Sequence, residues 1–129
     1  MNEFLAKGQP YALSLLRFMV GFLIFWHGSQ KLFAFPPSEM VGGELNAIVL
    51  TAGILEFGGG LLLIFGLFTR WTAFILSGLM AVAYWMAHGL SAFLPIVNRG
   101  ELAAVYCFVF LYLFFAGGGK VSLDNLFKK

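Results

Sequence analysis

The stretch AIVLTAGILEFGGGLLLIFGLF (47–68) carries a single ionisable residue, Glu56, among apolar residues and glycines. As an α-helix it is long enough to cross the hydrocarbon core of a bilayer, which needs about 20 apolar residues at roughly 1.5 Å rise each. Three further apolar stretches lie near residues 13–33, 71–90 and 102–118. The sequence therefore predicts an all-α integral membrane protein, an up-down bundle of four transmembrane helices that forms a single domain over residues 1–129.

The composition of the 129-residue chain favours a membrane protein and excludes several other classes. Hydrophobic residues make up 60% of the chain and charged residues 11%, whereas a soluble domain is about a quarter charged. The net charge of +2 is too small for a nucleic-acid-binding surface. The single cysteine, Cys107, excludes an intramolecular disulfide and a cysteine zinc site. We therefore expect membrane lipid as the surroundings, with no nucleic acid and no metal.

Turn and capping residues divide the four predicted helices. Pro36-Pro37 ends the first helix, Phe68-Thr69-Arg70 forms a tight turn between the second and the third, and Pro95 precedes the fourth. Asn98-Arg99-Gly100-Glu101 predicts a capping box at the start of the fourth helix, and Gly117-Gly118-Gly119 predicts its end. The first helix is too long for the apolar region of a secretory signal peptide, so we expect it to be retained.

The distribution of basic residues predicts the orientation, because loops rich in Lys and Arg stay in the cytoplasm. The N-terminus, the second loop and the C-terminus carry Lys7, Arg17, Arg70, Lys120, Lys128 and Lys129. The first and third loops carry Lys31 and Arg99, beside Glu39, Glu44 and Glu101. We therefore expect a multi-pass protein with both termini in the cytoplasm, and a short interfacial helix in the tail at 119–129.

Ionisable residues fall within the first two predicted spans. Such a residue costs about 2.5–3.5 kcal/mol at the centre of a membrane helix on insertion scales, which makes each one a candidate for function. Glu56 shares a helix face with glycines of the second span, and a basic stripe follows one face of the first span. The predicted intramembrane polar cluster is Arg17, His27, Lys31 and Glu56. We expect His27 to be the partner of Glu56 because it is nearest in depth, with Lys31 and Arg17 as alternatives.

The outer half of the bundle is also predicted to hold a small-molecule pocket bounded by the first three helices. The candidate pocket residues are Trp26, Gly28, Gly53, Gly60, Tyr84, Trp85, His88 and Tyr106. Aromatic walls, space beside glycines and a few polar groups are the usual features of such a site. Structural interpretations stay open: the tryptophans as membrane-belt anchors, the basic side chains reaching to the interfaces, and phenylalanines filling the space.

Five short motifs follow one another along nearly the whole chain. They are Arg17 with Gly21, WHGSQKLF (26–33), LEFGGGLLLIFGLFTR (55–70), NRGE (98–101) and GGGKVSLDNL (117–126). In this order and at these spacings they resemble the DoxX family of small four-span membrane proteins of bacteria and archaea. The tail departs slightly, with Gly118-Gly119-Lys120 where the family commonly has a proline-containing turn. The resemblance implies a place in the cell membrane and, as for the related DoxD subunits, association with an oxidoreductase complex and hence a redox protein partner.

Three functions are compatible with these features. The first is a membrane subunit of an oxidoreductase complex that binds a quinone-like molecule, with His27 and Lys31 as donors to its carbonyl oxygens and Glu56 as a proton relay. The second is a non-enzymatic anchor or assembly factor for a soluble redox enzyme, and the third is a small-solute transporter. Any of them can operate as a homo-oligomer.

No intrinsic cofactor is predicted. The sequence has no dinucleotide-binding glycine fingerprint, cysteine cluster or flavin motif. A haem held between His27 and His88 is disfavoured, because the two histidines are expected at different depths. Whether the chain catalyses a reaction alone is left open.

Overall fold

The computed structural model describes residues 1–38 and 45–128; Glu39 and Glu44 of the first loop and Lys129 of the tail lie outside the described residues. Of the described residues, 80% are helical, and the described ranges contain no strand. The elements in order are α1 (Asn2–Phe33), α2 (Ala47–Phe65), α3 (Thr69–Tyr84), the π-helix η1 (Trp85–Gly89), α4 (Pro95–Asn98), α5 (Glu101–Ala116) and α6 (Leu123–Phe127).

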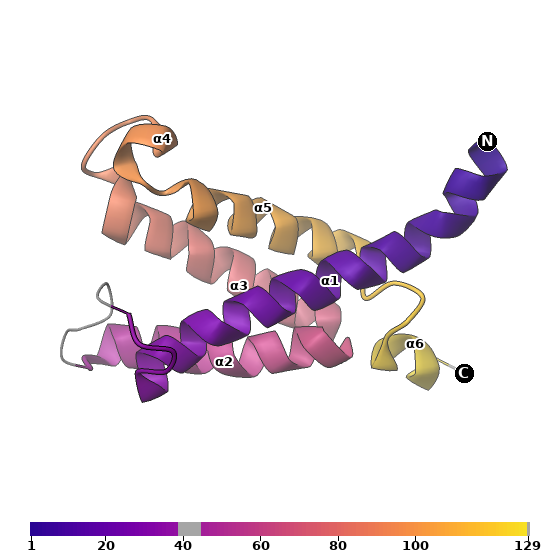
Figure 1. Cartoon of the computed structure of the whole chain (residues 1–129), viewed down its shortest axis with the longest axis horizontal. Helices are drawn as coiled ribbons and strands as arrows, with labels where there is room; N and C mark the ends of the chain where they lie inside the picture. Colours follow the sequence, from indigo (N-terminus) through magenta and orange to yellow (C-terminus); the bar gives the residue numbers. More distant parts are fainter. Residues whose placement is uncertain (39–44, 129) are drawn as a thin grey trace.

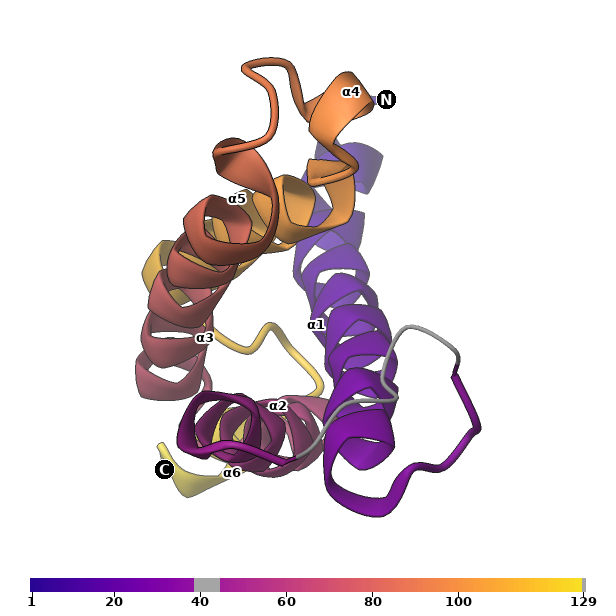
Figure 2. The same cartoon turned by 90° about the vertical axis from the view of Figure 1, so that its left-hand side faces the viewer.

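The four long helices α1, α2, α3 and α5 alternate in direction along the bundle (Figure 1). Seen from one end, α1 lies beside α2, and α3 lies beside α5 (Figure 2). Both chain ends lie at one end of the bundle, which we call the terminal end; the other is the distal end (Figure 1). The predicted all-α, up-down bundle is therefore confirmed.

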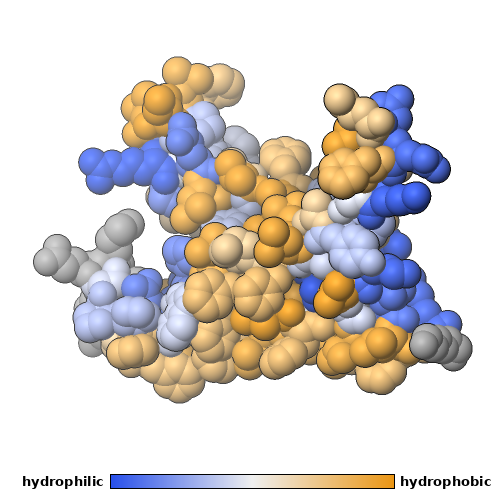
Figure 3. Space-filling model, turned by 45° about the vertical axis from the view of Figure 1, so that its right-hand side comes forward, coloured by the Kyte–Doolittle hydropathy of each residue, from blue (hydrophilic) through white to orange (hydrophobic). Residues whose placement is uncertain are grey.

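Three helical segments within the described ranges are long and apolar enough to cross a membrane: Asn2–Phe33, Ala47–Phe65 and Thr69–Gly89. The fourth, α5, has 16 residues, which at about 1.5 Å each is shorter than the roughly 30 Å hydrocarbon core. Apolar residues cover the middle of the face shown in Figure 3, and hydrophilic residues gather mainly toward its ends. The molecule is thus a membrane helical bundle, and α5 is shorter than the helices that are long enough to span the membrane.

The start of the first helix differs from the prediction. We expected it near residue 13, but α1 begins at Asn2 and continues through Pro10, so that its first turns extend beyond the rest of the bundle (Figure 1). Hydropathy marks the part of a helix that suits the membrane; it does not mark the helix end, because polar residues such as Glu3 and Lys7 are good helix formers.

The predicted capping box at residues 98–101 is wrong. Pro95 begins the one-turn helix α4, and Asn98 is its last residue. The Asn98 Oδ1 atom accepts a hydrogen bond from the Gly100 backbone N–H at 2.8 Å. Gly100 is the N-cap of α5 and Glu101 its first residue, so Glu101 does not occupy the third helical position that a capping box requires.

The core between the helices is filled by apolar side chains from all four long helices. Its buried hydrophobic members are Val20, Ile24, Leu63, Ala73, Leu76, Met80, Tyr106, Phe110 and Leu113. Because each of α1, α2, α3 and α5 contributes to this set, the two helix pairs pack as one bundle.

The backbones of α1 and α2 approach each other closely, and glycines make this contact possible. A Cβ atom at Gly28 of α1 would lie 2.7 Å from Phe57 Cα, and one at Gly60 of α2 would lie 2.8 Å from Phe25 Cα. Real side chains do not tolerate such distances, so any larger residue would force the helices apart. In a membrane, where lipid is as apolar as leucine, close packing of this kind is a main source of helix association.

Substitution of Gly28 by alanine is expected to lower the free energy of unfolding by about 1–3 kcal/mol, because the added methyl group overlaps the α2 backbone. Gly58→Ala is the matched control: a Cβ there has no neighbour within 4 Å, and alanine favours a helix over glycine by about 1 kcal/mol. Unfolding in mixed detergent micelles, followed by circular dichroism, measures both. Equal stability of the two variants would contradict the contact.

Candidate functional site

Two ionisable side chains form an ion pair between α1 and α2 in the distal half. The Lys31 Nζ atom donates to Glu56 Oε2 at 2.6 Å. The Glu56 side chain is 5% exposed and that of Lys31 is 24% exposed. The glycine contact positions the pair, because a Cβ atom at Gly53, one turn before Glu56, would lie 3.1 Å from Lys31 Cβ.

The prediction that His27 is the partner of Glu56 is wrong. Similar depth in the membrane is not sufficient for contact, because the direction of a side chain around the helix also decides its partner. Gly28 faces α2, and Lys31 follows it by three residues on the same face. His27 instead contacts α5, where its ring meets the Tyr106 ring edge-to-face at a centroid distance of 6.1 Å.

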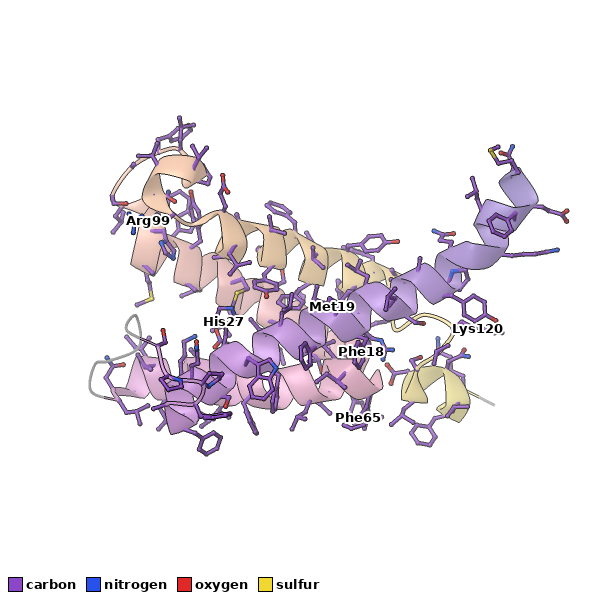
Figure 4. All side chains as sticks on the ribbon, in the orientation of Figure 1. Phe18, Met19, His27, Phe65, Arg99 and Lys120 are labelled. Carbon is purple, nitrogen blue, oxygen red and sulfur yellow. The ribbon has the colours of Figure 1, made fainter. Side chains whose placement is uncertain are left out.

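Tyr106 joins His27 to the aromatic core. Its side chain is buried, and its ring stacks on Phe110 of the same helix at 5.6 Å. The distal half therefore holds an ion pair, Lys31 with Glu56, and a ring contact, His27 with Tyr106, both made from one stretch of α1. Figure 4 shows His27 on the distal side of the bundle centre.

An apolar groove of about 600 Å³ opens beside the ion pair, between α2 and the α3–η1 segment. Its lining residues are Lys31, Ala47, Ile48, Val49, Thr51, Ala52, Leu79, Val82, Ala83, Met86 and Ala87. Lys31 is the charged residue in this set, so the groove presents one amine at the edge of an apolar surface. The lining comes from α1, α2, α3 and η1, and it includes none of the predicted pocket residues.

Several predicted pocket residues make other contacts. Tyr84 and His88 hold the segment before α5: the Asn98 Nδ2 atom donates to the Tyr84 hydroxyl at 2.9 Å, and His88 Nδ1 lies 3.1 Å from the Asn98 carbonyl oxygen. Trp85 is 60% exposed, and Trp26 packs edge-to-face on the ring of Phe25. These four side chains therefore do not line the groove.

The predicted pocket glycines lie elsewhere as well. Gly28, Gly53 and Gly60 are all at the α1–α2 contact, where atoms of the facing helix occupy the space beside them. We expected these glycines to leave room for a ligand. In the structure the missing side chains instead let the two helices approach, so the described residues do not combine the glycines and the aromatic side chains into one cavity.

Arg17, the remaining member of the predicted polar cluster, lies at the terminal end and does not contact Glu56. Its Nη2 atom donates to the Val121 carbonyl oxygen at 2.7 Å and to the Ser14 carbonyl oxygen at 3.4 Å. The side chain lies against Gly66, the left-handed residue that ends α2 at φ 72°. Arg17 thus joins α1 and the end of α2 to the C-terminal tail.

The C-terminal tail also caps α3. The Asp124 carboxylate accepts hydrogen bonds from the backbone N–H groups of Phe68 at 2.7 Å and Thr69 at 2.8 Å. The Asp124 N–H donates to the Gly66 carbonyl oxygen at 2.9 Å. A negative charge at the first turn of a helix is favourable because unpaired N–H groups and the positive end of the helix dipole meet there.

Arg70 makes the complementary contact at the end of α5. Its Nη1 atom donates to the Phe114 carbonyl oxygen at 2.9 Å and also to the Phe115 carbonyl oxygen. A positive charge stabilises the carbonyl end of a helix. We call Arg17, Arg70 and Asp124 together the tail clasp.

The tail clasp was not predicted, although the sequence contains a signal for it. The turn before α3 offers no local side-chain cap, since the N-cap position is Phe68, whose side chain cannot accept a hydrogen bond. A helix start without a local cap needs an acceptor from another segment. The tail does form the short helix that we expected, α6, with Ser122 Oγ accepting from Asn125 N–H at 3.2 Å.

No group of three or more His, Cys, Asp or Glu side chains within the described ranges is placed to hold a metal ion. The ionisable side chains described above take part in the Lys31–Glu56 pair, the His27–Tyr106 ring contact, the His88–Asn98 contact and the tail clasp.

A comparison with protein families matches the DoxX family to residues 12–89. The chain belongs to the DoxX family. The matched region runs from α1 to the end of η1 and includes Arg17, Lys31 and Glu56. The tail that caps this DoxX bundle lies beyond the matched region.

Two relatives of this DoxX protein come from Haemophilus influenzae, and each is described as an uncharacterized protein. One is 46% identical, over 100% of this chain and 99% of the relative. The other is 34% identical, over 95% of this chain and 87% of the relative. No solved structure matches the chain.

Removal of the Asp124 carboxylate by Asp124→Ala is expected to lower the free energy of unfolding by about 1–2 kcal/mol, because α3 loses its cap. Glu3→Ala removes the same charge from an exposed position in the first turn of α1 and is expected to change stability by less than about 0.5 kcal/mol. Detergent unfolding curves compare the two variants. An Asp124→Ala protein as stable as the control would show that the tail does not hold α3.

Proposed function

We propose that this protein is a multi-pass subunit of a membrane oxidoreductase complex, and that it binds a quinone-like molecule in the groove between α2 and α3. The observation that carries the proposal is the Lys31–Glu56 pair, at 2.6 Å, beside an apolar groove of about 600 Å³. In this reading the protein lies in a bacterial or archaeal cell membrane, and both termini are cytoplasmic.

The chemistry of the groove suits a quinone. Such a molecule needs apolar walls for its ring and tail, and a donor for a carbonyl oxygen. The Lys31 ammonium has three N–H groups, of which one is directed to Glu56, so others remain for a ligand. The η1 segment contributes Met86 and Ala87 to the wall, and π-helical turns occur frequently at functional sites.

The ion pair can also transfer the protons that quinone reduction requires. Reduction of a quinone to a quinol takes up two electrons and two protons. The electrons come from a redox protein partner, as the family resemblance implies. For each of the two protons, Lys31 protonates the reacting oxygen, and Glu56, hydrogen-bonded to Lys31, takes up a proton from water and passes it to the neutral Lys31 amine as a general acid–base group.

A second function, anchoring of a soluble enzyme, is favoured by a different feature. The first turns of α1 extend beyond the bundle at the terminal end (Figure 1), where Phe4 and Leu5 are exposed. Such a segment offers a docking surface that needs no ligand groove. In this function the Lys31–Glu56 pair only holds α1 against α2.

Single and double substitutions of the ion pair separate the two functions. Lys31→Met is expected to lower the free energy of unfolding by about 3 kcal/mol, because a buried carboxylate loses its partner. The double variant Lys31→Met with Glu56→Gln restores most of this stability but lacks the donor. It is expected to bind a short-chain ubiquinone analogue about ten-fold more weakly, as measured by calorimetry in detergent.

The groove itself is tested with an uncharged pair of variants. Val82→Phe, on α3, places a larger side chain in the groove. Ile54→Phe makes a similar change at an exposed position on α2 that does not line the groove. The first is expected to weaken quinone binding and the second to leave it unchanged. If both the stable double variant and Val82→Phe bind the quinone analogue with wild-type affinity, the proposed quinone site is wrong and the anchoring function is favoured.

The orientation is tested by labelling introduced cysteines in a Cys107→Ala background. Ser91→Cys, at the distal end, is expected to react with a membrane-impermeant maleimide in intact cells. Lys128→Cys, at the terminal end, is expected to react only after the inner membrane is permeabilised, because basic segments stay in the cytoplasm. Labelling of Lys128→Cys in intact cells would reverse the proposed topology.

A further inference from the structure

A second groove lies at the terminal end, away from the Lys31–Glu56 pair. It has a volume of about 610 Å³ and runs between α1, the end of α2 and the tail. Leu15, Phe18, Ile64 and Phe65 form apolar walls, and Lys120 lies among the lining residues. Figure 4 shows Phe18 and Phe65 on neighbouring helices, with Lys120 farther toward the terminal end.

A buried cation with unused donors lies in the wall of this groove. Arg17 is 3% exposed, lines the groove, and keeps its positive charge under all physiological conditions. Its Nη2 atom is bonded to carbonyl oxygens, whereas its Nε and Nη1 atoms are buried without a hydrogen-bond partner. Such donors are costly to leave unpaired.

The protein's own carboxylate at this end does not satisfy these donors. Asp124 accepts from the Phe68 and Thr69 N–H groups with its two oxygens. The Lys120 side chain adds a second positive charge at the mouth of the same groove. The groove therefore combines two cations with apolar walls and is complementary to an amphiphilic anion.

We propose that this groove binds an anionic phospholipid of the leaflet at the terminal end. The phosphate lies between Lys120 and Arg17, and an acyl chain follows Leu15, Phe18 and Phe65 toward the middle of the bundle. A lipid fits better than a soluble phosphate, because four of the lining residues are apolar side chains on membrane-spanning helices. Basic residues at the ends of such helices bind anionic head groups.

The site has a structural consequence. Arg17 already joins α1 to the tail through Val121, and the tail joins α2 to α3 through Asp124. A phosphate held by Arg17 and Lys120 adds a contact between α1 and the tail. The lipid would thus strengthen the tail clasp.

Native mass spectrometry of the delipidated protein tests the proposal, with dioleoyl phosphatidylglycerol and dioleoyl phosphatidylcholine as probes. Lys120→Gln is the informative variant, because its exposed side chain can be changed without breaking the tail clasp. Lys128→Gln is the matched control: it removes the same charge from the same tail, outside this groove. Glycerol phosphate serves as a soluble competitor.

Phosphatidylglycerol is expected to bind more tightly than phosphatidylcholine. Lys120→Gln is expected to weaken its binding about five-fold, the factor for about 1 kcal/mol from one lysine near an anionic surface, while Lys128→Gln preserves it. Equal binding of the two lipids, or equal losses in the two variants, would overturn the site in favour of general surface attraction. Displacement of the lipid by an equal concentration of glycerol phosphate would overturn the lipid assignment.

Discussion

The rest of the structure depends on the close contact between α1 and α2. Gly28 meets the backbone of Phe57, and Gly60 meets the backbone of Phe25. These two contacts fix the position of α1 along α2, which is the register of the two antiparallel helices. That register places Lys31 against Glu56 at one end of the contact and Arg17 against Gly66 at the other. Both grooves therefore take part of their chemistry from the same helix, α1, and from the way glycines let it approach α2.

The polar contacts at the terminal end of the bundle provide hydrogen-bond partners for backbone groups at helix ends, which a membrane makes costly to leave unpaired. Backbone N–H and C=O groups at helix ends have no partner within the helix, and the hydrocarbon core offers no water to replace one. The tail brings Asp124 to the start of α3, and Arg70 reaches the last carbonyl groups of α5. Residues remote in sequence thus pair backbone groups at the start of α3 and at the end of α5.

The sequence predicted the fold better than it predicted the site. Apolar length and periodicity were sufficient for the bundle, and the helix face that Glu56 shares with glycines was sufficient to predict that Glu56 faces the interior, where it is buried. Arg17 is buried as well, although the sequence left open that it reaches to the interface. Partner choice was not predictable in this way. It depends on the register of two helices and on the rotation of each, which placed Lys31 and not His27 beside Glu56. The tail clasp depends on contacts between residues 44 to 104 positions apart. The missing side-chain cap at Phe68 indicates that an acceptor is needed, but not which distant residue supplies it.

The same register bears on the meaning of the ion pair. A buried ion pair contributes little net stability compared with apolar side chains of similar size, and its best-attested structural use is to fix a register. Here the glycines already fix the register, because α1 and α2 meet at backbone distance at Gly28 and Gly60. The pair is therefore not needed to fix the register, and its lysine is partly exposed to an apolar groove. These two features are the reason for proposing that the pair serves a ligand in addition to the packing of the two helices.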